Sequence, residues 1–451
     1  MSELLIAQVT AGGPAIFLNT ILRGLAIGGV YAIIALGFVI IFKATQVVNF
    51  AQGALAAVGG LFLSFLVFDQ SSSDVPRGQT PFTWWRAPFA GDGLPQVEDQ
   101  WASVVLISFL AAVAASMLGG RSIPGWAMSG SLAAFLATRW LSTRAGFTFL
   151  EPALLSLVIA LVVFVVVGVA RGWRPNGIAA AFGIGAFGLQ LIVAAINSTW
   201  VDWFGNLAIA LLFGALLGMA LERSAIRPMI GKPLFSLAVI TLGLEIVIRQ
   251  TQSDSVRVLN RPVTAPWGAN PLDPASDGGF RIGGAFFDWS WIAILIAAGL
   301  SFLLVNVFYR SKLGVAMRAV SLDQEAAMAQ GINVGQVFAI AWAFGTGLAV
   351  LGGVFATQPP ISQAGAVTVS TALVAFRALP AVILGGLDSA KGALIGGLLI
   401  GLVEGFAGEY LSDFQDILGA GYAQIVPYIV MLVVLLTRPF GLYGTPEVRR
   451  V

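Results

Sequence analysis

The sequence predicts an all-α fold, a polytopic bundle of transmembrane helices in which some helices are broken. Of the 451 residues, 58% are hydrophobic and only 10% are charged, and the mean hydropathy is +0.89. Soluble domains carry about 25% charged residues, so this composition is that of a membrane protein. The apolar residues are also gathered into runs that approach the roughly 20 residues a helix needs to span a bilayer.

About 12 to 13 apolar segments follow one another along the chain, the count depending on two short ones, 126–142 and 422–437. In order, the segments lie near residues 14–42, 47–68, 101–120, 126–142, 149–170, 178–200, 205–222, 233–251, 289–309, 336–357, 367–386, 390–410 and 422–437.

The Lys and Arg residues predict how these segments are oriented. If the N-terminus lies outside and the spans alternate, the inner loops hold more basic residues than the outer ones, as cytoplasmic loops do. The loop 309–336, with Arg310 and Arg318, is then cytoplasmic, and so is the C-terminus. The polar stretches 69–100 and 252–288 are then extracytoplasmic loops or small caps.

The loop 309–336 contains a short predicted helix over residues 322–330. Ser321 is expected to be its N-cap, with Gln324 completing a capping box, and Gly331 supplies the left-handed position that ends it. Such a helix is either a docking element for a soluble partner or an ordinary connector between spans. The residues expected to carry a docking contact are Ser321, Glu325, Ala326, Ala327 and Gly331.

The sequence Glu325-Ala326-Ala327, with Gly331 four positions after the last alanine, resembles the EAA loop of bacterial ABC importer permeases. The wider run 318–334 resembles the branched-chain amino acid permeases of the LivH type. The resemblance covers roughly residues 14–68 and 205–445. Further motifs that carry it are Asn49-Phe50-Ala51-Gln52-Gly53, Glu222-Arg223, Arg227-Pro228, Arg438-Pro439 and Gly441-Leu442.

This resemblance implies a transmembrane permease subunit of an ABC importer in the bacterial inner membrane, a path for branched-chain or other hydrophobic amino acids. It also implies a second, LivM-like permease subunit, two ATP-binding subunits, a periplasmic substrate-binding protein, and 309–336 as the coupling loop. The chain has no phosphate-binding loop of the Gly-x-x-x-x-Gly-Lys-[Ser/Thr] type, so ATP is expected to be used by the partners. With neither His nor Cys, we expect no enzyme and no metal site. We also expect no cofactor in this chain and no nucleic-acid partner.

Residues outside the resemblance predict an insertion. We expect 1–68 to be the N-terminal part of the permease core and 205–451 to be the main core. The block 69–204 between them holds an external loop and about four extra transmembrane helices. An even number of added spans leaves the orientation of all later segments unchanged.

Two regions combine Gly or Pro with polar residues inside apolar sequence and are expected to be broken helices that border the substrate path. They are 47–60, with Asn49 and Gln52, and 375–386, with Arg377 and Pro380. Gln52 replaces a residue that is often His in the family. Arg377 is either a path residue or a side chain that snorkels near a helix end. The candidate path residues are Asn49, Gln52, Arg377 and Glu404.

Other solutes and another class of transporter stay open at this stage. A permease of the same family for urea or short amides would share the coupling loop. An ion-coupled secondary transporter or a channel would account for the intramembrane charges, but not for the capped cytoplasmic helix.

Overall fold

The structure is a computed structural model that describes residues 13–67, 199–229, 233–255, 260–263, 265–267, 278–282, 284–362, 365–412, 415–419 and 421–444. The predicted outer loop 69–100 and the predicted spans at 101–120, 126–142 and 149–170 lie outside the described residues, as does nearly all of 178–200.

Every apolar segment predicted within the described residues is a helix, so the all-α membrane bundle is confirmed. Five of these helices are long and apolar enough to cross a membrane. The long helices are α2 (Gly13–Thr45), α3 (Gln52–Val67), α10 (Thr199–Leu221), α11 (Leu234–Ser255), α12 (Trp289–Arg310), α15 (Val334–Ala356), α16 (Val374–Gly385), α17 (Ala390–Tyr410) and α19 (Tyr422–Thr437).

Short elements connect the long helices. On the helical side they are a π-helical turn η1 (Glu222–Ile226), 3-10 turns η2 (Arg227–Met229) and η3 (Val369–Leu373), and helices α13 (Lys312–Leu322), α14 (Gln324–Ala329) and α18 (Gln415–Leu418). Among the described residues, the strands are β1 (Asn260–Pro262), β2 (Gly279–Ile282), β3 (Ala285–Asp288) and β4 (Ala366–Thr368). β1 pairs antiparallel with β4, and β2 pairs antiparallel with β3 as a hairpin.

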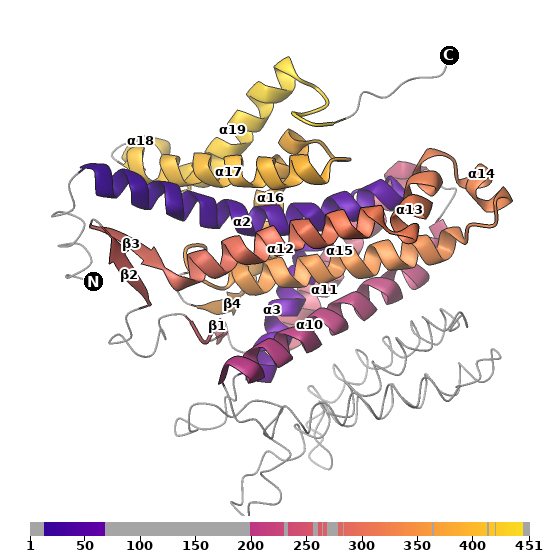
Figure 1. Cartoon of the computed structure of the whole chain (residues 1–451), viewed down its shortest axis with the longest axis horizontal. Helices are drawn as coiled ribbons and strands as arrows, with labels where there is room; N and C mark the ends of the chain where they lie inside the picture. The colour runs from indigo at the N-terminus through magenta and orange to yellow at the C-terminus, as the bar shows by residue number, and fades with distance from the viewer. Residues whose placement is uncertain are drawn as a thin grey trace, which may run out of the picture.

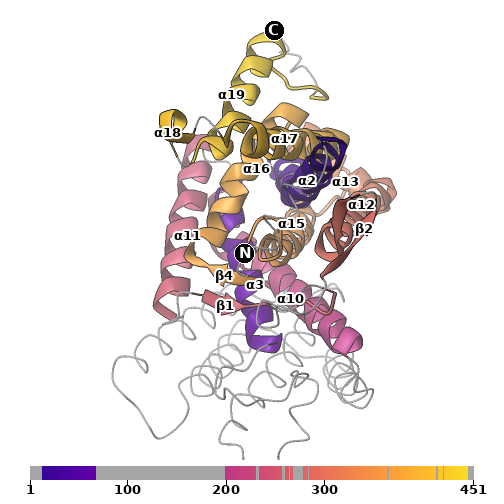
Figure 2. The ribbon, with the colours of Figure 1, turned by 90° about the vertical axis from the view of Figure 1, so that its left-hand side faces the viewer.

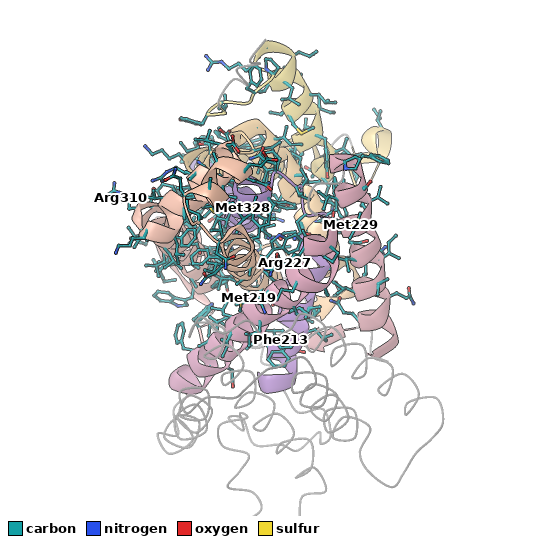
Figure 3. The ribbon with its side chains drawn as sticks, turned by 90° about the vertical axis from the view of Figure 1, so that its right-hand side faces the viewer. Phe213, Met219, Arg227, Met229, Arg310 and Met328 are labelled. Carbon is teal, nitrogen blue, oxygen red and sulfur yellow. The ribbon has the colours of Figure 1, made fainter. Side chains whose placement is uncertain are left out.

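The bundle has two distinct ends, shown in Figure 1 with α14 at one and the β2–β3 hairpin at the other. We name the first the basic end, because it carries Lys43, Arg227, Arg310 and Arg318, and the second the strand end. Figure 3 looks onto the basic end, where Arg227 and Arg310 are labelled. Within each described stretch, consecutive long helices run in alternate directions between the ends, and α3 starts inside the bundle.

α2 is enclosed by other helices, and in the end-on view of Figure 2 it lies among α12, α15, α16 and α17. It packs against all four of them. Its contact with α17 is backbone to backbone, because a Cβ on Gly28 would lie 2.7 Å from the carbonyl oxygen of Gly397. Small residues permit such close approach of membrane helices, so these glycines are packing positions.

The outward face of α12 shows where lipid meets the bundle. Ile296, Leu300, Leu303 and Val307 recur at helical spacing and are 57–60% exposed. A stripe of large exposed apolar residues is unfavourable in water but suits a hydrocarbon environment. The opposite face of α12 buries Ile294, Ala298 and Val305 in the core.

Candidate functional site

The short helix predicted in the loop 309–336 is present, but its cap is not the predicted one. Asp323, in extended conformation, caps α14 by accepting a hydrogen bond from the Ala326 amide at 2.9 Å. Ser321 still belongs to α13, where its hydroxyl donates to the Arg318 carbonyl at 2.9 Å. The predicted capping box of Ser321 and Gln324 is therefore wrong, because the chain turns two residues later than expected.

The other end of α14 forms as predicted. Gly331 has φ +81°, the left-handed conformation that glycine adopts without strain. The Ile332 amide donates to the Ala327 carbonyl at 3.0 Å, and the Gly331 amide donates to the Met328 carbonyl at 2.9 Å. These two hydrogen bonds are those of a Schellman motif, which fixes the direction in which the chain leaves the helix.

The exposed face of α14 differs from the predicted one at one residue. Ala327 is 4% exposed and belongs to the hydrophobic core, so it is not available to a partner surface. Glu325 and Ala326 are exposed, as the docking hypothesis requires. Leu322 and Met328 are the large apolar residues exposed beside them, at 88% and 54%.

A charged clamp holds the start of α15 near this loop. Arg227 donates two hydrogen bonds to the Glu222 carboxylate, at 3.0 and 2.9 Å, and a third to the carbonyl of Gly335, in the first turn of α15, at 2.6 Å. Glu222 is fully buried. A Cβ at Gly335 would lie 3.0 Å from the guanidinium carbon, so a side chain there would press on the Arg227 head group. Sequence reasoning found both charges only as family motifs. Their spacing of five residues matches no regular α-helical pairing, because Glu222 is the first residue of the π-helical turn and Arg227 follows its end.

A second set of contacts at the basic end joins α2 to its neighbours. The Lys43 ammonium donates to the Asp388 carbonyl at 3.1 Å and lies 5.0 Å from the centre of the Tyr309 ring. Arg318 of α13 donates to the Tyr309 carbonyl at 2.7 Å. The loop 309–336 is thus tied to α2 as well as to α15.

The C-terminal motif of the resemblance also has a structural role at this end. The Leu442 amide donates to the Leu384 carbonyl at 2.7 Å, and the Tyr443 amide to the Gly385 carbonyl at 3.1 Å. Gly441 has φ +76°, which lets the chain turn back onto the end of α16. The motif therefore satisfies carbonyls that the end of a helix leaves free.

The first predicted break lies between α2 and α3. The helix ends after Thr45, Gln46 has φ +57°, and α3 begins at Gln52 and continues past Gly60. The break is thus at 46–51, the first part of the expected 47–60, and the rest of that range is regular helix.

Asn49 and Gln52 are fully buried and hold this break in place. The Asn49 side-chain amide donates to the Gln52 side-chain oxygen at 2.9 Å, and the Gln52 amide donates to the Gly345 carbonyl of α15 at 3.0 Å. Thr241 of α11 accepts from the Phe50 amide at 3.2 Å. Both predicted path residues therefore have protein partners, and they fasten the interrupted backbone to α15.

The second predicted break, 375–386, is not present, because α16 is continuous through Pro380. Proline has no amide hydrogen, so it leaves the carbonyl four residues earlier, that of Phe376, without its helical partner. The Tyr428 hydroxyl of α19 donates to that carbonyl at 2.8 Å. A neighbouring helix thus supplies the missing hydrogen bond, which is how proline is tolerated inside membrane helices.

The other two predicted path residues lie together. The Tyr31 hydroxyl of α2 donates to the Glu404 carboxylate of α17 at 2.6 Å. Arg377 of α16 interacts electrostatically with both, and Arg23 of α2 with Glu404. Sequence reasoning chose Arg377 and Glu404 singly as intramembrane charges, but it missed Tyr31, which is 373 positions from its partner.

Among the described residues, no group of three or more His, Cys, Asp or Glu side chains is placed to hold a metal ion. The polar residues join helices to one another, and the exposed capped helix stands at one end.

Comparison with known proteins agrees with this description. A family model described as "Branched-chain amino acid transport system / permease component" matches residues 20–174 and 148–435. The chain is 28% identical to the high-affinity branched-chain amino acid transport system permease proteins LivH of Salmonella typhimurium and of Escherichia coli. These matches span 279 residues, 59% of this chain and 84% of each relative.

Two other relatives broaden the comparison. BraD of Pseudomonas aeruginosa, a permease protein of the same kind of system, is 27% identical over 272 residues, 58% of this chain and 81% of BraD. The nucleoside ABC transporter permease protein NupC of Lactococcus lactis is 31% identical over 157 residues, 34% of this chain and 48% of NupC. No solved structure matches significantly. On the family match, which runs over most of its length, the chain belongs to the family of branched-chain amino acid transport permease components.

Proposed function

We propose that this chain is the permease subunit of an ABC importer and forms part of a path for branched-chain or other hydrophobic amino acids across the bacterial inner membrane. The observation that carries the proposal is α14, an exposed helix whose two ends are fixed by Asp323 and Gly331. It stands beside the most basic loops of the bundle, and cytoplasmic loops are the basic ones.

The energy source in this proposal is a pair of ATP-binding subunits that dock on α14. A docking helix passes on force only if its own base is rigid, because a flexible loop would absorb the motion. The base of α14 is held by buried Ala327 and, through the start of α15, by the clamp of Arg227 with Glu222. ATP is then the partners' ligand, and this chain needs no cofactor.

The remaining partners follow from the same reasoning. Two permease subunits are needed to enclose a path, so a LivM-like paralogue or a second copy is proposed. A periplasmic binding protein would deliver the solute at the strand end. The block 69–204 is proposed to be a peripheral insertion, in keeping with relatives that are covered over 84% of their length by only 59% of this chain.

The solute is the least constrained part of the proposal, because NupC is named for nucleosides and LivH for branched-chain amino acids. Urea or a short amide is the neutral alternative. An ion-coupled transporter or channel loses support, because neither would require a rigid capped helix or resemble permease components of transport systems.

The test is uptake into vesicles by the complete importer. The chain would be purified with its paralogue and ATP-binding subunits, reconstituted, and supplied with the cognate binding protein. Accumulation of labelled leucine, isoleucine or valine that requires ATP supports the proposal. ATP-dependent accumulation of urea or adenosine instead would redirect it to those solutes, and uptake driven by an ion gradient without ATP would refute it.

A further inference from the structure

One face of α12 spans the hydrocarbon layer and ends in a cation. The exposed residues on this face recur at helical spacing and are Trp289, Ile296, Leu300, Leu303, Val307 and Arg310. The helix has 22 residues, so it is about 33 Å long, close to the roughly 30 Å of a hydrocarbon core. Tryptophan and arginine are residues that anchor spans at the two membrane surfaces. Arg310 therefore lies at the depth of the lipid headgroups at the basic end.

A tight corner fixes the direction in which α13 leaves α12. The Ser311 hydroxyl donates to the Phe308 carbonyl at 2.6 Å and accepts from the Gly314 amide at 3.3 Å. A Cβ on Gly314 would overlap the Phe308 carbonyl oxygen, so glycine permits this close approach. Arg318 donates to the Tyr309 carbonyl at 2.7 Å across the same corner. The start of α13 is therefore held beside the end of α12, at the same depth as Arg310.

The exposed face of α13 combines basic and apolar residues. The opposite face is buried in the core through Met317 and Val320. On the exposed face Val315, which is 53% exposed, lies between Lys312 and Arg318, three positions to either side. Such a face suits the boundary between headgroups and acyl chains, because the cationic groups reach the phosphates while the apolar side chain avoids water.

The corner of α12 and α13 carries positive charge that has no counter-charge nearby in the sequence. From Trp289 to Leu322 the chain holds Arg310, Lys312 and Arg318 and no acidic residue. Arg310 and Lys312 are exposed, and neither forms an ion pair or a hydrogen bond with another residue that the structure describes. Clusters of cations directly beside a span attract anionic lipid headgroups, whose phosphate oxygens accept charge-assisted hydrogen bonds.

The apolar surface that continues from the corner favours a lipid over a soluble partner. Val307, one turn before Arg310, is 60% exposed on the lipid-facing row of α12, and Leu313 beside the corner is 42% exposed. The docking helix α14 stands farther out at the basic end than α13, as Figure 1 shows. A molecule that contacts both the cations and the row on α12 must be anionic at one end and apolar along its length.

We propose that the corner of α12 and α13 binds an anionic phospholipid of the leaflet at the basic end. Arg310, Lys312 and Arg318 contact its phosphate headgroup, and an acyl chain lies along α12 beside Val307. The bound lipid fastens the base of α14 to the membrane surface, since α13 leads directly into α14. This inference goes beyond the proposed function, because it requires only that the chain is a membrane permease and depends on neither the solute nor the energy source.

The test uses the chain's lack of cysteine. Val315→Cys is labelled with a fluorophore in the permease as purified with its partner subunits, which are freed of accessible cysteine. The labelled protein is placed in phosphatidylcholine vesicles with a small fraction of quencher lipid, either phosphatidylglycerol or phosphatidylcholine, each with the same nitroxide on an acyl chain. We expect phosphatidylglycerol to quench the fluorophore at lower mole fractions than phosphatidylcholine, and added salt to reduce this preference by screening.

Two other labelled positions calibrate the measurement. Ile296→Cys lies on the exposed face of α12 nearer the strand end, so both quencher lipids should act on it equally. Ala326→Cys, exposed on α14, should be quenched by neither. None of these readings involves solute uptake or ATP hydrolysis, so they are independent of the proposed function.

A pair of matched variants, each added to the labelled Val315→Cys chain, identifies the cations that bind the headgroup. In Arg310→Gln/Lys312→Gln the preference for phosphatidylglycerol should fall by about fivefold for each cation removed. Lys391→Gln/Arg438→Gln removes the same charge from exposed positions elsewhere at the basic end and should leave the preference unchanged. An equal fall in both variants would show general attraction to the membrane surface rather than a site, and would overturn the proposal.

Two further outcomes would also overturn it, and neither requires an altered cation. Equal quenching of the label at position 315 by the two lipids would mean that this face meets hydrocarbon without selecting a headgroup. Quenching by neither lipid until the partner subunits are removed would mean that a protein covers the corner. If the Gln variants do not assemble, the salt dependence measured on the Val315→Cys chain still decides, because a preference that salt does not change is not a contact with exposed cations.

Discussion

The clamp of Arg227 with Glu222 permits a prediction that joins stability to energy coupling. In Arg227→Gln, Glu222 keeps a buried carboxylate but loses two charge-assisted hydrogen bonds, of 3.0 and 2.9 Å. Removing one partner of a buried ion pair costs about 3 to 5 kcal/mol, since the other charge is left without compensation. The Arg227 side chain is 37% exposed, so water already screens the pair and the lower value, about 3 kcal/mol, is expected.

The same substitution should weaken coupling, because Arg227 also holds the Gly335 carbonyl at the start of α15. Thermal inactivation of the purified complex reports the loss of stability. ATP hydrolysis stimulated by the loaded binding protein reports the coupling. We expect a fall of several degrees in the inactivation temperature, together with stimulated hydrolysis reduced well below the wild-type level.

Two further variants make the reasoning refutable. In Glu222→Gln/Arg227→Gln no buried charge remains, so more than half of the lost stability should return while coupling stays weak. Arg249→Gln breaks the ion pair with Glu245, in which the Arg249 Nε and Glu245 Oε1 atoms are 2.8 Å apart. Both residues belong to α11, so the substitution should lower stability without a specific loss of coupling. If Arg227→Gln is as stable as the wild type, or if the double variant is no better than the single one, the clamp does not act as described.

Three other predictions concern the coupling helix and the insertion. Ala326→Trp, at an exposed position, should block co-purification of the ATP-binding subunits and leave the thermal stability of the chain unchanged. Ala327→Trp, at a buried position, should lower the thermal stability of the chain itself. The reverse pattern would show that the docking face is misassigned. Gly331→Val should cost about 1 to 2 kcal/mol at the left-handed turn. The variant should still assemble, but its stimulated ATP hydrolysis in vesicles should be lower than that of the wild type. Stimulation at the wild-type level would show that α14 is only a connector. A deletion that joins Phe68 to Gly205 should still assemble with the ATP-binding subunits by co-purification, and complete loss of assembly would place the insertion in the core.

The helices of this bundle could be predicted because the requirement that a membrane places on each span is visible in the local sequence. A span must form its backbone hydrogen bonds internally and present an apolar surface of a given length, so each span appears in the sequence as a run of apolar residues. The shorter helices α3, α16 and α19 were found in the same way. The signal needs no knowledge of which helices are neighbours.

The details of the coupling helix depended on information that local sequence lacks. Ser321 and Asp323 are both good N-caps, and the choice between them was made by α13, which continues through Leu322. Gly331 was predictable because a left-handed helix end is a local need that few residues other than glycine meet. The burial of Ala327 was not, because it depends on how α13 and α15 close around α14.

The path residues show the same limit over longer distances. A proline inside an apolar segment favours a break, but Tyr428 on another helix supplies the hydrogen bond that Pro380 removes, and α16 stays whole. The lone charges Arg377 and Glu404 were conspicuous in sequence, since such residues are rare in spans. Their mutual position was not, because the helices that carry them are assembled around Tyr31 of α2.

The central place of α2 suggests which parts of this subunit can move during transport. Its glycines meet α17 at Gly397 and leave no room even for a methyl group, so α2 and α17 must move as one body. α15 is fastened to the break after α2 through Gln52. Motion received at α14 therefore reaches α2 and α17 together, whereas α19 meets the bundle through α16 and α17 along one side. A shift of α19 relative to that body would widen or close the open apolar groove between the two helices, which is lined by residues that include Phe406 and Ala407 of α17 and Val426 of α19.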